Sequence, residues 1–233
     1  MNNKTSMEKL LAWGVHLYTA LGGVAGFFAL CASVNENYIV AFSLLLLSSA
    51  IDATDGLIAR LVDVKRTLPS FDGSMLDNVI DIFTYAWLPL FIIAQITSFS
   101  LIVMVLPVLA SLYAYGQVNM KTEDNYFLGF PTYWNIIALY FYLLGIDGLL
   151  GIAILFIFTL LTFIPTKYLY PSKHSNKFYR LFFMLGGAIW VLLICYILVV
   201  PNSTLTHLSL FYPLSYLCLS LYEDLKKRSL LCF

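Results

Sequence analysis

Four aspartates stand at two regular spacings inside an otherwise apolar stretch of this sequence. Asp52 and Asp55 are three residues apart, and Asp77 and Asp81 are four residues apart. Side chains at either spacing lie on one face of a helix, so two helices can each point a pair into a shared space. A carboxylate at membrane depth is costly, and it normally marks a functional site or a partnered charge. The four aspartates therefore predict a site for divalent cations, with more than one ion bound.

The residues beside these aspartates fit a ligand that carries phosphate. Hard cations such as Mg²⁺ and Mn²⁺ prefer oxygen ligands, and two of them can clamp the attacking and leaving oxygens of a displacement at phosphorus. Gly56 and the small Ala59 let a ligand approach the helix closely, and Gly73 is expected to permit close helix packing. Arg60 offers a permanently charged, planar fork suited to phosphate or to a base carbonyl.

The elements that position these residues must be membrane helices. The 233 residues are 61% hydrophobic and only 11% charged, whereas a soluble domain carries roughly 25% charged residues. We expect an all-α integral membrane protein of about eight spans, each near the about 20 residues that a bilayer helix needs. The apolar segments are 11–32, 38–61, 73–95, 98–118, 131–146, 148–169, 179–200 and 204–222.

The chain reads as one domain. No linker or change of composition divides residues 1–233, and we expect residues 1–10 to form a short interfacial segment and 52–81 to form the catalytic motif. The apolar stretch after Lys9 is too long for a cleavable signal and lacks a small-residue cleavage site. The four cysteines have no zinc-type spacing. No basic run is interleaved with aromatic residues, so nucleic acid is not expected as a partner.

The placement of charge gives an independent test of this topology. With eight spans, all thirteen lysines and arginines fall at one membrane face, at the termini, in the even-numbered loops and at the adjoining helix ends. The opposite face has Glu36, Asp147 and Asn202 but no basic residue. Because basic residues are enriched on the cytoplasmic side, both termini are predicted to be cytoplasmic. The four aspartates then lie just inside the membrane at its cytoplasmic face.

The block from Asp52 to Asp81 reads DxxDGxxAR, a spacer and GxxxDxxxD, and it resembles the signature of the CDP-alcohol phosphotransferase family. The twelve residues between Arg60 and Gly73 are a few more than the common family pattern. The resemblance implies that Mg²⁺ or Mn²⁺, as two ions, is bound by three aspartates. It implies that Asp81 is the general base and can also touch metal, and that the protein is a homodimer. The implied metal ligands are Asp52, Asp55 and Asp77, and the implied CDP-binding residues are Asp52, Asp55, Gly56, Ala59, Arg60 and Asp77.

Further stretches resemble the branch of this family that joins free choline to CDP-diacylglycerol, giving phosphatidylcholine and CMP. They are 69–73, 76–78, 129–131, 134–135 and 163–171. The resemblance implies attack of the choline hydroxyl on the lipid-side phosphorus, at the cytoplasmic face of a bacterial inner membrane. Serine or glycerol phosphate is an alternative acceptor, although the third span has no basic residues near the site to bind a phosphate-bearing acceptor.

Choline carries a quaternary ammonium, which proteins hold with aromatic faces and nearby negative charge. Tyr85 lies one turn beyond Asp81 on the same helix face and is the first candidate for such a cage. The other aromatic candidates are Trp134, Tyr133 and Tyr18, with Glu123 or Asp124 as possible counter-charges. The alternative is that these tyrosines and tryptophans belong to the aromatic belts at the membrane interfaces.

Three neighbouring residues have two open interpretations each. His16 is either a buried histidine that donates one hydrogen bond or a ligand contact. Asp63 and Asp72 either order the spacer or add to the site. For the protein as a whole, the alternative to an enzyme is a cation-coupled transporter that uses the intramembrane carboxylates as its coupling site.

Overall fold

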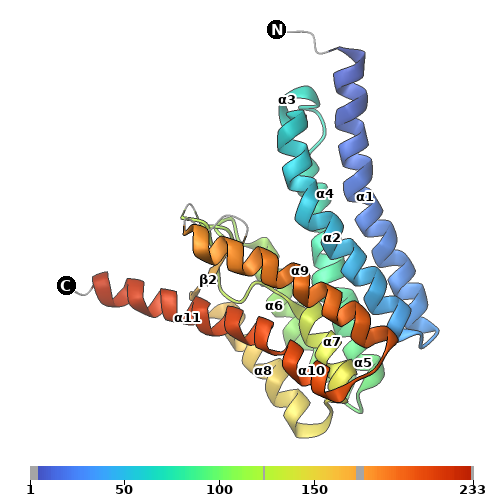
Figure 1. The fold of residues 1–233 in the computed structure, drawn as a ribbon, viewed down its shortest axis with the longest axis vertical. Helices are drawn as coiled ribbons and strands as arrows, with labels where there is room; N and C mark the ends of the chain where they lie inside the picture. Colours follow the sequence, from blue (N-terminus) through green and yellow to red (C-terminus); the bar gives the residue numbers. More distant parts are fainter. Residues whose placement is uncertain (1–4, 123, 172–175, 232–233) are drawn as a thin grey trace. The chain divides into compact units, whose positions relative to one another are not determined.

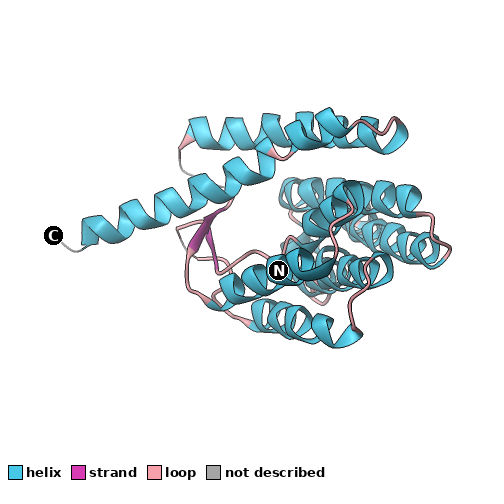
Figure 2. Ribbon diagram, turned by 90° about the horizontal axis from the view of Figure 1, so that it is seen from below, coloured by secondary structure: helices cyan, strands magenta, loops and turns pink. Residues whose placement is uncertain are grey.

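The computed structural model describes residues 5–122, 124–171 and 176–231, whose regular secondary structure is helical apart from one two-stranded sheet (Figures 1 and 2). Glu123, the other candidate counter-charge, lies outside the described residues, as do Lys4 and Lys173 of the basic residues. The chain forms two compact units, which divide between Ile92 and Ile93. Each unit is described by itself.

Four helical segments of the described chain are long and apolar enough to cross a membrane. They are α1 (Ser6–Val34), α2 (Tyr38–Val62), the continuous run Gly73–Ile96 and α9 (Lys177–Val199). Three shorter apolar helical segments are Leu101–Gly116, Trp134–Leu144 and Gly148–Phe163. Every one of the eight predicted apolar segments therefore contains helix, with the last divided into α10 (Ser203–Ser209) and α11 (Phe211–Leu231). The number of crossings stays a prediction.

The start of α1 is fixed by a capping box. The backbone amide of Glu8 donates to Thr5 Oγ1 at 3.2 Å, and the amide of Thr5 donates to Glu8 Oε2 at 2.7 Å. Such reciprocal bonds satisfy helix-end donors that have no partner within the helix. Residues 6–10 of the predicted interfacial segment 1–10 form the first turns of this helix, and their position at the membrane interface stays a prediction.

Small residues let α1 lie close to its neighbours in the first unit. The α1 and α2 ribbons run side by side in Figure 1. A Cβ atom on Gly22 would lie 3.5 Å from Ile51 Cγ2 of α2. A Cβ on Gly26 would lie only 2.6 Å from Thr84 Cγ2 in η1 (Ile82–Trp87), the π-helical turn that follows α4 (Gly73–Asp81). Close helix approach of this kind is a common use of glycine in membrane proteins.

The Gly26→Ala substitution is expected to lower the free energy of unfolding of the protein in detergent. Overpacking costs about 1–3 kcal/mol, and the higher helix propensity of alanine offsets about 1 kcal/mol of that loss. Gly14→Ala is the matched control, because a Cβ at Gly14 would have nothing within 4 Å. Thermal unfolding of both variants checks this. Equal midpoints for Gly26→Ala and Gly14→Ala would contradict the tight packing of α1 on η1.

The spacer between the two aspartate pairs is ordered by its own acidic residues. Asp63 ends α2 in the left-handed conformation, with φ 54°, and α3 (Val64–Thr67) follows. Val64 and Leu68 pack against Ala12 and Val15 of α1. Asp72 then caps α4 by accepting hydrogen bonds from the amides of Ser74 and Met75 at 3.0 and 3.1 Å.

The second unit contains the sheet, which the all-α prediction missed. Strand β1 (Tyr126–Leu128) pairs with β2 (Lys167–Leu169) in antiparallel register, with Phe127 opposite Tyr168. The predicted apolar segment 148–169 therefore contains a helix, α8 (Gly148–Phe163), followed by a strand. The physical reason is Pro165, because the residue before a proline is pushed out of the helical region. Figure 2 shows this sheet in magenta.

Four side chains of α11 hydrogen-bond to the backbone of β2 and the residues just before it. Tyr216 donates to the Leu169 carbonyl at 2.9 Å, and Ser220 accepts from the Leu169 amide at 3.2 Å. Asp224 accepts from the Lys167 amide at 3.0 Å, and Arg228 donates to the Pro165 carbonyl at 2.7 Å. Spaced four residues apart, these side chains form what we call the α11 ladder. It covers a strand edge that would otherwise lack partners.

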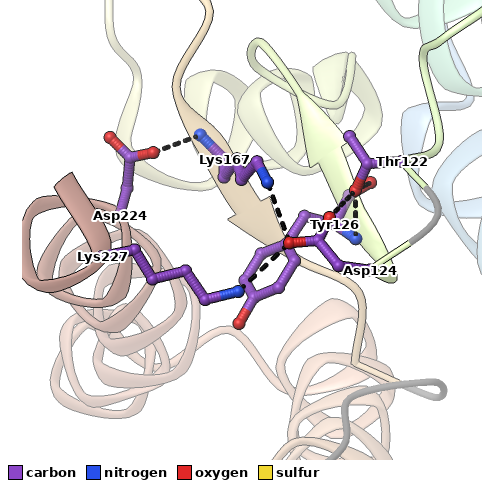
Figure 3. Close-up of polar contacts among 6 residues, drawn as sticks. All are labelled: Thr122, Asp124, Tyr126, Lys167, Asp224 and Lys227. Carbon is purple, nitrogen blue, oxygen red and sulfur yellow. Dashed lines mark hydrogen bonds and ion pairs between the residues drawn. The ribbon is translucent and has the colours of Figure 1, made fainter. Parts of the chain in front are cut away.

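Asp124 is held by two lysines beside this sheet (Figure 3). Its Oδ2 lies 2.8 Å from Lys167 Nζ and 3.2 Å from Lys227 Nζ, and Lys227 Nζ also lies 3.9 Å from the centre of the Tyr126 ring. Burial by itself would raise the pKa of Asp124, but hydrogen bonds from Lys167, Thr122 and Lys227 lower it well below its usual value. The charge of this candidate counter-ion for choline is therefore already matched within its own unit.

Candidate active site

Three of the four predicted metal ligands meet in the first unit. Each of Asp52, Asp55 and Asp77 offers a carboxylate oxygen, and these oxygens all lie within 4.8 Å of one another. Asp55 is buried, whereas Asp52 and Asp77 are half-buried. The first two come from one face of α2 and the third from α4, as the spacing predicts. We refer to these three residues as the aspartate triad.

Neighbouring hydroxyl groups orient the aspartate triad. Thr19 on α1 donates to Asp55 Oδ2 at 2.7 Å, and the Tyr85 hydroxyl donates to Asp52 Oδ2 at 2.7 Å. Hydrogen bonds of this kind fix the direction of metal-binding carboxylates. Three carboxylates so close together repel one another, and a cation relieves that repulsion. The donor set therefore fits a hard divalent cation such as Mg²⁺ or Mn²⁺.

Asp81 lies one turn after Asp77, at the end of α4, and does not belong to the group whose oxygens lie within 4.8 Å. The backbone changes to the π-helical turn η1 at the next residue. Such turns occur mostly as single insertions in α-helices and often at functional sites. Tyr85, the first candidate for choline contact, is part of η1 and touches the triad through Asp52. Nothing in the sequence pattern signalled this turn.

A pocket of about 470 Å³ opens beside the triad. It is lined by parts of α1, α2, the spacer and the start of α4. Among the predicted site residues, its walls contain Asp55, Gly56, Ala59, Gly73 and Asp77. Other lining residues, which the signature did not mark, include His16, Thr19, Lys65, Phe71, Asp72 and Ser74. Only their position near the motif in the sequence could have indicated Lys65 and Ser74, whereas Phe71 lies in the stretch 69–73 that resembles the choline-using branch.

Gly56 and Gly73 both stand where a side chain would meet a neighbour. A Cβ on Gly73 would lie 2.7 Å from His16 Cε1, so this glycine lets α4 pack against α1. A Cβ on Gly56 would lie 3.5 Å from Arg60 Nη1. Arg60, which is exposed and lies one turn further along α2, therefore has its guanidinium next to Gly56, a lining residue of the pocket.

The remaining aromatic candidates lie apart from the pocket lining. The Tyr18 hydroxyl is 2.8 Å from Thr54 Oγ1, on the α2 turn that carries Asp52 and Asp55. Tyr133 and Trp134 belong to the second unit. There, Tyr133 lines an apolar pocket of about 310 Å³, and Trp134 is fully buried with its ring centre 5.9 Å from that of Phe130. A role of these three residues in choline binding stays a prediction.

Residues 16–165 match the model of the CDP-alcohol phosphatidyltransferase family, so the chain belongs to this family. It is a multi-pass membrane enzyme, with long apolar helices that carry an acidic site. The family resemblance predicted from the aspartate block is confirmed.

Among its curated relatives are several bacterial phosphatidylcholine synthases. The chain is 40% identical to that of Pseudomonas aeruginosa over 173 residues, which cover 72% of this chain and 73% of the relative. It is 34% identical to that of Legionella pneumophila over 231 residues, covering 94% and 91%. The phosphatidylcholine synthase of Borreliella burgdorferi is 33% identical over 172 residues, covering 72% and 74%.

Proposed function

We propose that this protein is a phosphatidylcholine synthase. It transfers the phosphatidyl group of CDP-diacylglycerol to free choline and releases CMP. The observation that carries the chemistry is the aspartate triad, two of whose members line a pocket, within a chain of the CDP-alcohol phosphatidyltransferase family. The choice of choline is supported by the similarity to phosphatidylcholine synthases over up to 94% of the chain. Because the chain belongs to a family of enzymes, the alternative hypothesis of a cation-coupled transporter is disfavoured.

In this proposal, the aspartate triad holds Mn²⁺ or Mg²⁺ as two ions. When bound, the metal neutralises the diphosphate of the donor and stabilises the leaving CMP. Gly56 and Ala59 leave space beside Asp55 for the nucleotide, and Arg60 next to Gly56 adds a fixed positive charge for phosphate. The triad thus positions the lipid-side phosphorus for attack.

Asp81 takes the proton from the choline hydroxyl while the oxygen of that hydroxyl attacks the lipid-side phosphorus. A base must reach that proton through a hydrogen bond, so choline has to bind between Asp81 and the donor. The position of Asp81 one helical turn beyond Asp77 supports this division of roles, since one helix face then presents a ligand followed by a base. A second role of Asp81 as a metal ligand is part of the same proposal.

The Tyr85→Ala substitution is expected to raise the KM for choline by about tenfold or more, because it removes an aromatic face for the quaternary ammonium. Tyr85→Phe keeps that face and loses only the hydrogen bond to Asp52. It is therefore expected to change the KM for choline by less than about threefold and to act mainly on metal affinity. Steady-state kinetics of both variants, at saturating and limiting Mn²⁺, checks this. Equal choline KM values for Tyr85→Ala and the unmodified protein would remove Tyr85 from the choline site.

The proposal also includes the placement in the membrane. We place eight crossings with both termini and the pocket at the cytoplasmic face of a bacterial inner membrane, because one face then collects all thirteen basic residues. The family match runs from residue 16 to 165, through both compact units, which supports one functional domain. A homodimer is expected by analogy with the family.

The test is CMP release by the purified protein in detergent with CDP-diacylglycerol, comparing choline, serine and glycerol phosphate with and without Mn²⁺. Release that requires both choline and metal is the expected result. Metal-dependent release with serine alone would keep the chemistry and replace the acceptor. No release with any of the acceptors, by folded protein, would overturn the proposal.

A further inference from the structure

One wall of the pocket has no part in the metal chemistry described above. It is made by His16 of α1 and Phe71 of the spacer, whose ring centres are 4.4 Å apart. Trp13 packs on the outside of this pair, with its ring centre 5.2 Å from that of Phe71 and 5.8 Å from that of His16, and does not line the pocket. Three aromatic rings thus gather where the spacer folds over α1.

His16 carries a polar atom that the described residues leave without a partner. Its side chain is only 6% exposed, and Nε2 is buried with no hydrogen-bond partner among them. Of the two interpretations of His16, the internal hydrogen bond is therefore not found at Nε2, and this atom favours the ligand contact. A buried polar atom without a partner costs free energy, and a ligand in the pocket can provide the missing hydrogen bond.

The position of His16 relates this wall to the metal site. Thr19, which bonds to Asp55 of the aspartate triad, lies one turn further along the same helix. Three residues of helix correspond to roughly 5 Å. The pocket that Asp55 and Asp77 of the triad line is also lined by Lys65 and Phe71 of the spacer. A donor with its diphosphate at the triad can therefore place its nucleoside against His16 and Phe71.

We propose that His16 and Phe71 form the nucleobase subsite of the pocket, an inference that rests on the proposed function. The base stacks on the Phe71 ring, since every base offers a flat π-face to an aromatic side chain. Its polar edge hydrogen-bonds to His16 Nε2. In a neutral imidazole, this nitrogen either donates to a ring carbonyl or accepts from an exocyclic amino group, and cytosine offers both.

This subsite lies outside the signature residues of the block. His16 lies on α1, whereas the block begins at Asp52 on α2. Phe71 belongs to the twelve-residue spacer, which is the part of the block that departs from the common pattern. The signature residues hold the phosphates, whereas His16 and Phe71 select the base. This division predicts that the affinity for the base can be lost without loss of affinity for the sugar phosphate.

The experiment compares the dissociation constants of CMP and ribose 5-phosphate for the full-length protein in detergent with Mn²⁺. His16→Leu and Phe71→Leu are each expected to weaken CMP binding by about tenfold and to leave ribose 5-phosphate binding within about twofold. Trp13→Leu is the matched control and is expected to change neither, because Trp13 contacts the same two rings from outside the pocket. Phe71 is 37% exposed, so Phe71→Leu keeps the test decisive if His16→Leu does not fold.

Unchanged CMP affinity in Phe71→Leu and His16→Leu would overturn the inference, as would an equal loss for both ligands. A selective loss in only one variant overturns the assignment of the other residue. Failure of the proposed function has a different signature, because the unmodified protein would then not bind CMP at all. CMP binding without choline turnover would change the acceptor and leave the nucleobase subsite in place.

Discussion

Replacing Asp81 with Asn is expected to lower the rate of choline-dependent CMP release by about 10²- to 10⁴-fold, the range over which general base catalysis contributes. The amide is nearly the same size as the carboxylate but cannot accept the proton of the choline hydroxyl. CMP and Mn²⁺ should still bind in large part, because the three aspartates of the triad remain in place even if Asp81 also contacts the metal. Rates at saturating choline, together with direct CMP binding, separate loss of the base from loss of the site.

Asp63→Asn is the matched control for this variant. It removes one carboxylate from the exposed end of α2, outside the pocket, and asparagine tolerates the left-handed conformation of this position. Its turnover should equal that of the unmodified protein. If Asp81→Asn keeps more than about a tenth of the activity, Asp81 is not the base.

Loss of one triad ligand is expected to have an effect of similar size through the metal. Asp77→Asn should raise the Mn²⁺ concentration for half-maximal activity by more than about 100-fold, since even the partners of metal ligands contribute about 10- to 100-fold. Protein stripped with a chelator should show no CMP release until Mn²⁺ or Mg²⁺ is returned. The measurement is activity against metal concentration, repeated for Asp63→Asn.

A second readout for Asp77→Asn does not depend on turnover. A ligand that binds only the folded state raises the unfolding temperature, so Mn²⁺ should stabilise the unmodified protein and Asp63→Asn but not Asp77→Asn. If Mn²⁺ raises the unfolding temperature of Asp77→Asn as much as that of the unmodified protein, the triad does not hold the metal.

The triad could be predicted from the sequence because the spacings that define it are short and lie within single helices. The spacings of Asp52 to Asp55 and of Asp77 to Asp81 define helix faces, and the signature states which faces meet. The partners of these residues depend on contacts between distant segments. Thr19 is 36 residues from the Asp55 that it contacts, and no period in the sequence relates the two.

The missed features of the backbone have the same origin. The turn η1 lies inside an apolar stretch that the sequence predicts as one continuous helix, and Gly26 of α1 packs directly against its Thr84. The strand β2 continues an apolar segment that reads as helix up to Pro165, and it is stabilised by β1 and by side chains of α11. Tertiary contacts therefore override the local pattern at both places.

The α11 ladder sets an order of events during biosynthesis. β2 ends at Leu169, whereas the side chains that satisfy its outer edge begin at Tyr216 and continue to Arg228. The ribosome therefore releases β1 and β2 well before their covering helix, and the amides of Lys167 and Leu169 must bond to water or to another chain in the meantime. Translation that stops before Tyr216 leaves an open strand edge in the nascent protein, and such edges recruit foreign strands.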